Sequence, residues 1–145
     1  MLIGQYQHNI DAKGRVIVPA KFREDLGELF YVTKGLDHCL FVLSQEEWKR
    51  LEKQLQEMPM SKARKLQLFF FSGAAEAETD KQGRILIPQH LRDYAGLTKD
   101  IVSVGTSNRA EIWDTQRWNH YEQGQTQGTA SGTAPLRNGP GTPAG

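Results

Sequence analysis

The chain has 145 residues, a formal net charge of +1 and a single cysteine, Cys39. No stretch approaches the roughly 20 apolar residues that a membrane-spanning helix needs, and one cysteine excludes an internal disulfide. The N-terminus has neither a basic leader nor a long apolar core, so no secretory signal is expected. These features favour a soluble protein of the cytoplasm, and a balanced total charge does not exclude a local cluster of cations.

One thirteen-residue pattern occurs twice. It reads D-A-K-G-R-V-I-V-P-A-K-F-R from Asp11 to Arg23 and D-K-Q-G-R-I-L-I-P-Q-H-L-R from Asp80 to Arg92. Five positions are identical and four more exchange one apolar residue for another. A repeat of this closeness indicates one structural unit that is used twice.

The similarity continues past the motif and divides the chain into four parts. The predicted parts are a first repeat (1–55), a connecting helix (56–73), a second repeat (74–121) and a tail (122–145). Neither repeat alone would bury much core, so the two are expected to pack on each other or on neighbouring chains. The tail is rich in Gly, Thr, Ala and Pro, a composition that predicts a disordered appendage.

The first repeat is expected to open with two strands joined by a turn, over 3–10, 11–14 and 16–18. The uninterrupted apolar run of the second strand predicts that it is covered on both faces. Pro19 fits the first position of a short helix, where its missing amide hydrogen is not needed. Gly27 is expected to end that helix.

Two further strands, over 30–32 and 40–43, complete the first repeat. Ser44 and Glu47 form a capping-box pattern that opens the repeat's final helix. Ser61 is expected to cap the connecting helix.

The second repeat is expected to follow the same order, with strands over 76–79, 85–87, 101–104 and 111–113. Pro88 and Gly96 would bound its short helix, and Asp114 would cap its final helix. Trp48 and Trp118 occupy equivalent helical positions, where a core anchor is expected rather than a residue that stacks on a ligand. The predicted fold class is α+β, mainly β with short helices.

Each motif begins with the residue types of a tight turn. Asp11 and Asp80 occupy the first position, and Gly14 and Gly83 occupy the fourth, as in type I turns. An aspartate side chain can accept hydrogen bonds from turn amides, and glycine can adopt the left-handed conformation that follows. These four residues are predicted to shape the turns.

An arginine, Arg15 or Arg84, directly follows each turn glycine. A rigid turn would hold its guanidinium outward, where it could bind phosphate or the O6/N7 edge of guanine bidentately. Lys13 and Lys81 lie within the turns and would add phosphate contacts. The alternative is an arginine paired with the aspartate four residues earlier, which the aspartate's role in the turn disfavours. The pattern therefore predicts a site for double-stranded DNA.

The two copies differ in charge. The first has Lys13 and Lys21 where the second has Gln82 and His90. The arginine of the first copy is therefore expected to make the stronger DNA contact.

The doubled D-x-x-G-R-x-x-x-P core and the D-H-C-L-F-V-L and E-I-W-D segments resemble the MraZ family over residues 1–121. Its D-x-x-x-R signature falls on Asp11 and Arg15 and again on Asp80 and Arg84. The resemblance implies two tandem AbrB/SpoVT-like swapped-hairpin repeats, packed as a pseudo-symmetric unit within a ring-shaped homo-oligomer. It also implies a bacterial, nucleoid-associated transcriptional regulator. Such a protein binds short G-rich direct repeats upstream of the division and cell-wall gene cluster and usually represses it.

Other classes of function fit less well. Asp11 and Asp80 could form an acid/base dyad, but each begins a solvent-facing turn beside basic residues, so no enzyme and no small-molecule substrate are expected. His38 and Cys39 would point to opposite faces of a strand, so no metal or other cofactor is expected, and Cys39 is interpreted as a buried structural thiol. An antitoxin-like or other protein-interaction module is the alternative, which the complete second copy disfavours.

Overall fold

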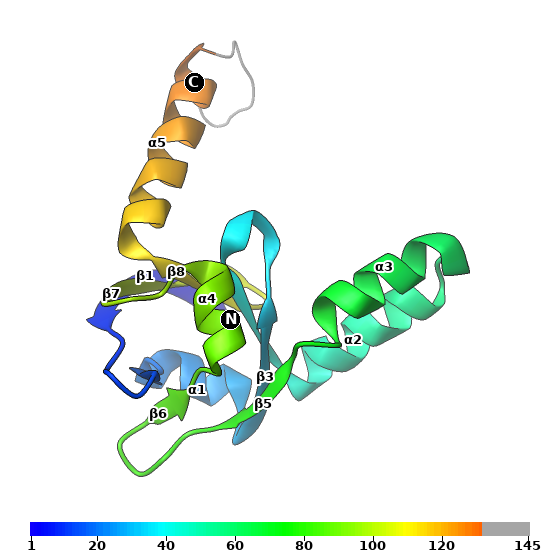
Figure 1. The fold of residues 1–145 in the computed structure, drawn as a ribbon, viewed down its shortest axis with the longest axis horizontal. Helices are drawn as coiled ribbons and strands as arrows, with labels where there is room; N and C mark the ends of the chain where they lie inside the picture. The colour runs from blue at the N-terminus through cyan, green and yellow to red at the C-terminus, as the bar shows by residue number, and fades with distance from the viewer. Residues whose placement is uncertain (132–145) are drawn as a thin grey trace. The chain divides into compact units, whose positions relative to one another are not determined.

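The computed structural model describes residues 1–131, and the chain separates into a unit of residues 1–114 and a second unit that begins at Thr115. The described residues contain five α-helices and mainly antiparallel strands (Figure 1). The predicted α+β class is therefore confirmed. No helix within residues 1–131 is long and apolar enough to cross a membrane.

All eight predicted strands are present in the first unit. In chain order its elements are β1 (Leu2–Asn9), β2 (Arg15–Ile17), α1 (Ala20–Leu26), β3 (Leu29–Lys34), β4 (Leu40–Ser44), α2 (Gln45–Gln56), α3 (Met60–Phe70), β5 (Ala75–Glu78), β6 (Arg84–Leu86), α4 (Gln89–Ala95), β7 (Asp100–Ser107) and β8 (Ala110–Asp114). A short 3-10 helix, Leu36–His38, joins β3 to β4.

Six strands form one sheet in the order β1-β7-β8-β4-β3-β5. The opening strand of each half pairs with a strand of the other half, β1 with β7 and β5 with β3. The equivalent strands β4 and β8 pair at the centre. The order of equivalent strands is therefore the same when it is read from either edge, and neither half could build this sheet alone.

The two copies of the motif pair with each other in a second, two-stranded sheet, the β2–β6 ribbon. Its antiparallel register sets Arg15 opposite Leu86, Val16 opposite Ile85, and Ile17 opposite Arg84. The middle residues are buried, whereas Ile17 is 51% exposed and Leu86 is 61% exposed. The prediction that these strands are covered on both faces is wrong, because a ribbon lying on a larger sheet turns alternate residues outward.

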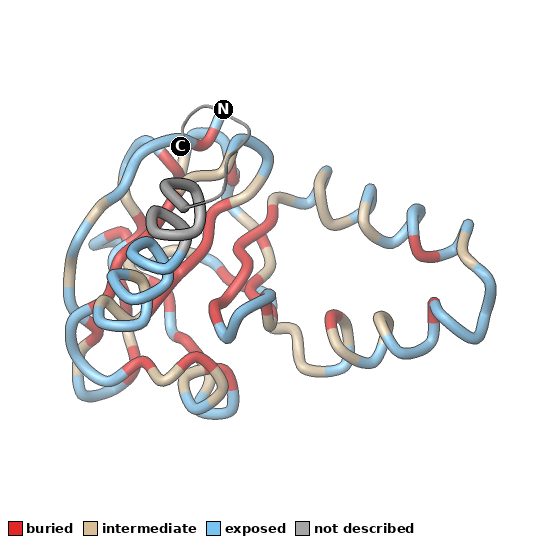
Figure 2. Tube along the Cα trace, turned by 90° about the horizontal axis from the view of Figure 1, so that it is seen from above, coloured by how far each residue is buried: buried red, intermediate tan, exposed pale blue. Residues whose placement is uncertain are grey.

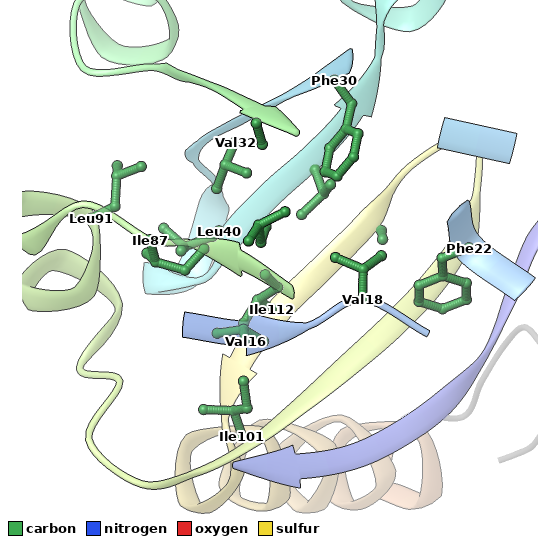
Figure 3. Close-up of a cluster of buried hydrophobic side chains, with 14 of the residues drawn as sticks. Val16, Val18, Phe22, Phe30, Val32, Leu40, Ile87, Leu91, Ile101 and Ile112 are labelled. Carbon is green, nitrogen blue, oxygen red and sulfur yellow. The ribbon is translucent and has the colours of Figure 1, made fainter. Parts of the chain in front are cut away.

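The inner face of the ribbon belongs to the hydrophobic core. Figure 3 shows Val16 of the ribbon and Ile87, which directly follows β6, among the buried side chains of the larger sheet, with Leu91 of α4 next to Ile87 and Phe22 of α1 next to Val18. The larger sheet contributes Phe30, Val32, Leu40, Ile101 and Ile112. Burying such side chains stabilises the fold by about 1.5–3 kcal/mol each. The buried inner face therefore holds the ribbon against the six-stranded sheet.

The short helices α1 and α4 begin and end at the residues that the motif repeats. Pro19 and Pro88 immediately precede these helices, whereas each proline was expected at the first helical position, so each helix begins one residue later than predicted. Gly27 and Gly96 end them, with φ of 83° and 66°. These positive values lie in the region that glycine adopts without strain.

Helices α2 and α3 form a hairpin that extends away from the sheet and is largely exposed or half-buried (Figure 2). Trp48 lies at its base, stacked on Tyr31 with ring centroids 4.7 Å apart and edge-on to Phe71 at 4.6 Å. It is half-buried, so it anchors the hairpin rather than the main core. Phe70 is buried and stacks on Phe41.

The residues at the starts of α2 and α3 agree with one predicted cap and not with the other. The Ser44 hydroxyl accepts a hydrogen bond from the Glu47 amide at 3.2 Å, so the cap at Ser44 is confirmed. The Glu47 carboxylate pairs with Arg50 at 2.8 Å instead of completing the predicted capping box. Ser61 caps nothing, because α3 already begins at Met60 after Pro59. Proline has no amide hydrogen and a fixed φ, which suits a helix start.

Replacing Ser44 by alanine is expected to lower the free energy of unfolding by about 1 kcal/mol, because the Glu47 amide loses its acceptor. Urea denaturation of the variant measures this. Replacing Ser61 by alanine is the matched control and should change stability by less than about 0.5 kcal/mol. Equal losses in the two variants would contradict the assignment of the cap.

The described part of the second unit is the helix α5 (Thr115–Ser131). It begins directly after Asp114, as predicted. Trp118 is half-buried and stacks on Tyr121 of the same helix, with centroids 6.2 Å apart. Of the tail predicted over 122–145, residues 122–131 belong to α5 and the rest lie outside the described residues.

Candidate nucleic-acid interface

Each turn is closed by its own backbone and by its aspartate. The Gly14 amide donates to the Asp11 carbonyl at 3.0 Å, and the Asp11 Oδ1 accepts from the amides of Lys13 and Arg15 at 2.9 and 2.8 Å. Gly14 has a φ of 89°. Because glycine alone adopts this conformation at little cost, the arginine can follow the turn directly.

The second turn repeats these contacts. The Asp80 Oδ1 accepts from the amides of Gln82 and Arg84, both at 2.9 Å, and Gly83 has a φ of 78°. In both turns the amide of the arginine, hydrogen-bonded to the carboxylate, is the main reason why the pKa of the aspartate lies below its ordinary value. The two aspartates are therefore held as anions.

The second carboxylate oxygen of each aspartate binds the arginine side chain. Arg15 Nε lies 2.8 Å from Asp11 Oδ2, and Arg84 Nε lies 3.0 Å from Asp80 Oδ2. The prediction that the turn disfavours this ion pair is wrong, because a carboxylate has two oxygens and serves both. The pairing uses Nε and orients the guanidinium, and within residues 1–131 its terminal nitrogens donate no hydrogen bond.

Arg15, Ile17, Arg84 and Leu86 share the outer face of the β2–β6 ribbon. The register places each arginine directly across from the aliphatic residue of the other strand. The arginine side chains are 34% and 27% exposed, so they are accessible although they are paired. Diagonal neighbours on such a ribbon are about 7–8 Å apart, roughly two steps of a nucleic-acid duplex at about 3.4 Å per step.

The last arginine of each motif packs against the turn of the other copy. A methyl group added at Gly83 would overlap the guanidinium of Arg23, and one added at Gly14 would lie 2.7 Å from Cζ of Arg92. Arg92 Nε also donates to the Ile87 carbonyl at 2.9 Å. The two half-buried guanidiniums therefore cover the turn glycines.

Backbone hydrogen bonds join the same two turns to the opposite strands. The Val18 amide donates to the Gly83 carbonyl at 2.9 Å, and the Ile87 amide donates to the Gly14 carbonyl at 2.8 Å. Each turn is thus braced by the other copy of the motif. The terminal arginines are among the identical positions of the motif, but the sequence predicts no role for them because their partners are distant along the chain.

Residues 1–68 and 70–135 match a family model described as "MraZ protein, putative antitoxin-like". The chain belongs to the MraZ family. A "Transcriptional regulator MraZ" of Caldanaerobacter subterraneus subsp. tengcongensis is 57% identical over 125 residues, which are 85% of this chain and 87% of the relative. Relatives of the same name are 58% identical over 123 residues, in Acetivibrio thermocellus and Thermoanaerobacter sp. strain X514, each covering 83% of this chain and 86% of the relative.

In this member of the MraZ family, the remaining charged residues of the motifs lie at different kinds of position. Lys13 and Lys81 are exposed on the turns, and Lys21 is exposed on α1. His90, the counterpart of Lys21, is held by the Gly73 carbonyl, 2.7 Å from its Nε2. The first copy therefore presents the more cationic surface of the two.

The cysteine and the candidate metal ligands carry no site of their own among the described residues. Cys39 is fully buried, as predicted, and burial raises the pKa of its thiol, which lies 3.6 Å from a Glu111 carboxylate oxygen. The part of the chain that the structure describes contains no group of three or more His, Cys, Asp or Glu side chains arranged for a metal ion.

Proposed function

We propose that this chain is a DNA-binding transcriptional regulator, as the name of its relatives suggests. The observation that carries the proposal is the outer face of the β2–β6 ribbon, on which Arg15 and Arg84 stand on two braced turns. A two-stranded ribbon fits the major groove of B-DNA, which is about 12 Å wide.

In this proposal the arginines read base edges and the turn lysines bind the backbone. A guanidinium can donate two hydrogen bonds to the O6 and N7 atoms of guanine, which suits G-rich repeats. Lys13 and Lys81 would lie over phosphates on either side of the ribbon. Asp11, Gly14, Asp80 and Gly83 would act indirectly, because they fix where each guanidinium points.

The proposed regulator consists of two swapped-hairpin repeats and assembles into a ring. The exchange of β1 and β5 between the two halves supports tandem AbrB/SpoVT-like swapped-hairpin repeats over 1–55 and 74–121, joined by 56–73. A ring-shaped homo-oligomer would present one ribbon per chain and would gain affinity for DNA that carries several repeats. The regulated target would be the division and cell-wall gene cluster, with repression as the outcome and the nucleoid as the place of action.

Binding to the DNA upstream of its own gene is expected to weaken steeply with salt, because phosphate contacts release counterions. Changing Lys13 and Lys81 together to alanine should flatten the slope of log K against log [salt] by about 2 for each chain bound. Titrations at several salt concentrations measure this slope. The preference for the repeats over scrambled DNA should survive in this variant, and an unchanged slope would remove the lysines from the interface.

A second candidate is a protein-interaction module of the antitoxin type, which the description of the family favours. The two candidates differ in what the intact protein retains from a cell extract treated with nuclease. Capture of a small toxic protein, together with equal affinity for repeats and scrambled DNA, would support this module and oppose the regulator.

A further inference from the structure

The outer face of the ribbon carries two large aliphatic side chains that the DNA-binding proposal leaves without a role. Ile17 is 51% exposed and Leu86 is 61% exposed. Each lies directly across the ribbon from an arginine, Ile17 from Arg84 and Leu86 from Arg15. The face therefore consists of two pairs, each made of one cation and one aliphatic group.

We infer that Ile17 and Leu86 are specificity-determining residues, which contact the C5-methyl groups of thymines in the major groove beside the guanines bound by Arg84 and Arg15. This inference rests on the proposed function, since it concerns the same face of the ribbon. Each half of the ribbon would then cover one thymine methyl group beside the guanine that its arginine binds.

The chemistry of the groove favours this partner. Only thymine presents an apolar group in the major groove, and aliphatic side chains recognise it by contact. Directly opposed residues of an antiparallel pair have Cβ atoms about 4.5–5.5 Å apart. This separation is between one and two duplex steps of about 3.4 Å, so a cation and its aliphatic neighbour would reach the same or adjacent base pairs.

Two other occupants of these side chains fit less well. A wedge in the minor groove, which is about 6 Å wide, would require the duplex to be kinked open, and the thymine methyl groups do not lie in that groove. A second copy of the chain, docked symmetrically on this face, would bring Arg15 and Arg84 against the arginines of its partner. Like charges across an interface oppose such an association.

The test compares the upstream duplex with one in which every thymine of the repeats is replaced by deoxyuridine. This change removes the methyl groups and leaves the hydrogen-bonding edges intact. The wild-type protein should bind the deoxyuridine duplex about fourfold more weakly for each methyl group that an aliphatic side chain covers. The Ile17→Ala, Leu86→Ala double variant should bind the thymine duplex more weakly and should no longer distinguish the two duplexes.

Leu36→Ala is the matched control, because Leu36 is also 61% exposed but lies in the connection between β3 and β4. It should retain the full preference for thymine. Equal binding of both duplexes by the wild-type protein, with repeats still preferred over scrambled DNA, would refute the inference and leave the proposed function intact. Equal binding of the repeats and scrambled DNA by the wild-type protein would refute the proposed function. A smaller mass in solution for the double variant would assign these side chains to contacts between copies instead.

Discussion

Replacing Arg15 by alanine is expected to weaken binding to the upstream repeats by about 5- to 150-fold, which corresponds to the loss of one bidentate guanine contact of about 1–3 kcal/mol. The side chain is 34% exposed and lies on the outer face of the ribbon, away from the hydrophobic core. The substitution also leaves the Asp11 carboxylate without its cation, so a negative charge would face the DNA. That repulsion acts on any DNA, but the guanine contact is made only with the repeats, so affinity for the repeats should fall more than affinity for scrambled DNA.

The same substitution at Arg84 is expected to have the smaller effect. Lys13 and Lys21 flank the first arginine, whereas Gln82 and a histidine held by the Gly73 carbonyl take their places in the second copy. Titration of both variants at one salt concentration ranks them. A larger loss from Arg84→Ala would reverse the ranking, and equal losses would mean that the charge difference has no effect.

Two further variants test the geometry of the arginine contact and the location of the interface. Arg15→Lys keeps the positive charge but lacks the planar fork of donors, so it should keep affinity for scrambled DNA and lose preference for the repeats. Arg50→Ala removes an arginine that is paired with Glu47 on α2, away from the ribbon, and should leave DNA binding unchanged. Weaker binding of the Arg50 variant would place the interface elsewhere.

The sequence predicted the elements well because their signals are local. Gly27 and Gly96 end their helices, and the cap at Ser44 depends on a residue three positions away. The failures concern partners that are distant along the chain. A run such as Val16 to Val18 is too short to show which strand pairs with it, so the exposure of Ile17 could not be predicted.

The arginine site was predictable only in part, for the same reason. The spacing of Asp11 and Arg15 allowed both a turn and an ion pair, and the geometry of one carboxylate satisfies both. The role of Arg23 depends on Gly83, which lies in the other copy of the motif. Nothing within thirteen residues indicates that contact, although the identity of the arginine in both copies was a signal that the position matters.

Changing Gly83 to alanine is expected to destabilise the protein by about 1–3 kcal/mol and to weaken DNA binding as well. A left-handed residue other than glycine costs about 1–2 kcal/mol, and Gly83 has a φ of 78°. The added methyl group would also displace the guanidinium of Arg23, which covers the turn. The turn that presents Arg84 would then lose part of its brace.

Gly27 separates these two contributions, because it also has a positive φ (83°, with ψ −171°, a region that essentially only glycine adopts) and no atom lies within 4 Å of an added methyl group. Gly27→Ala should therefore lose only the backbone part of the stability and should bind DNA normally. Combining Gly83→Ala with Arg23→Ala should cost less than the sum of the two single changes, since the displaced side chain is absent. Urea denaturation and DNA titration of the four variants measure both quantities. Strict additivity, or a Gly27 variant that loses DNA binding as the Gly83 variant does, would show that Arg23 does not brace the opposite turn.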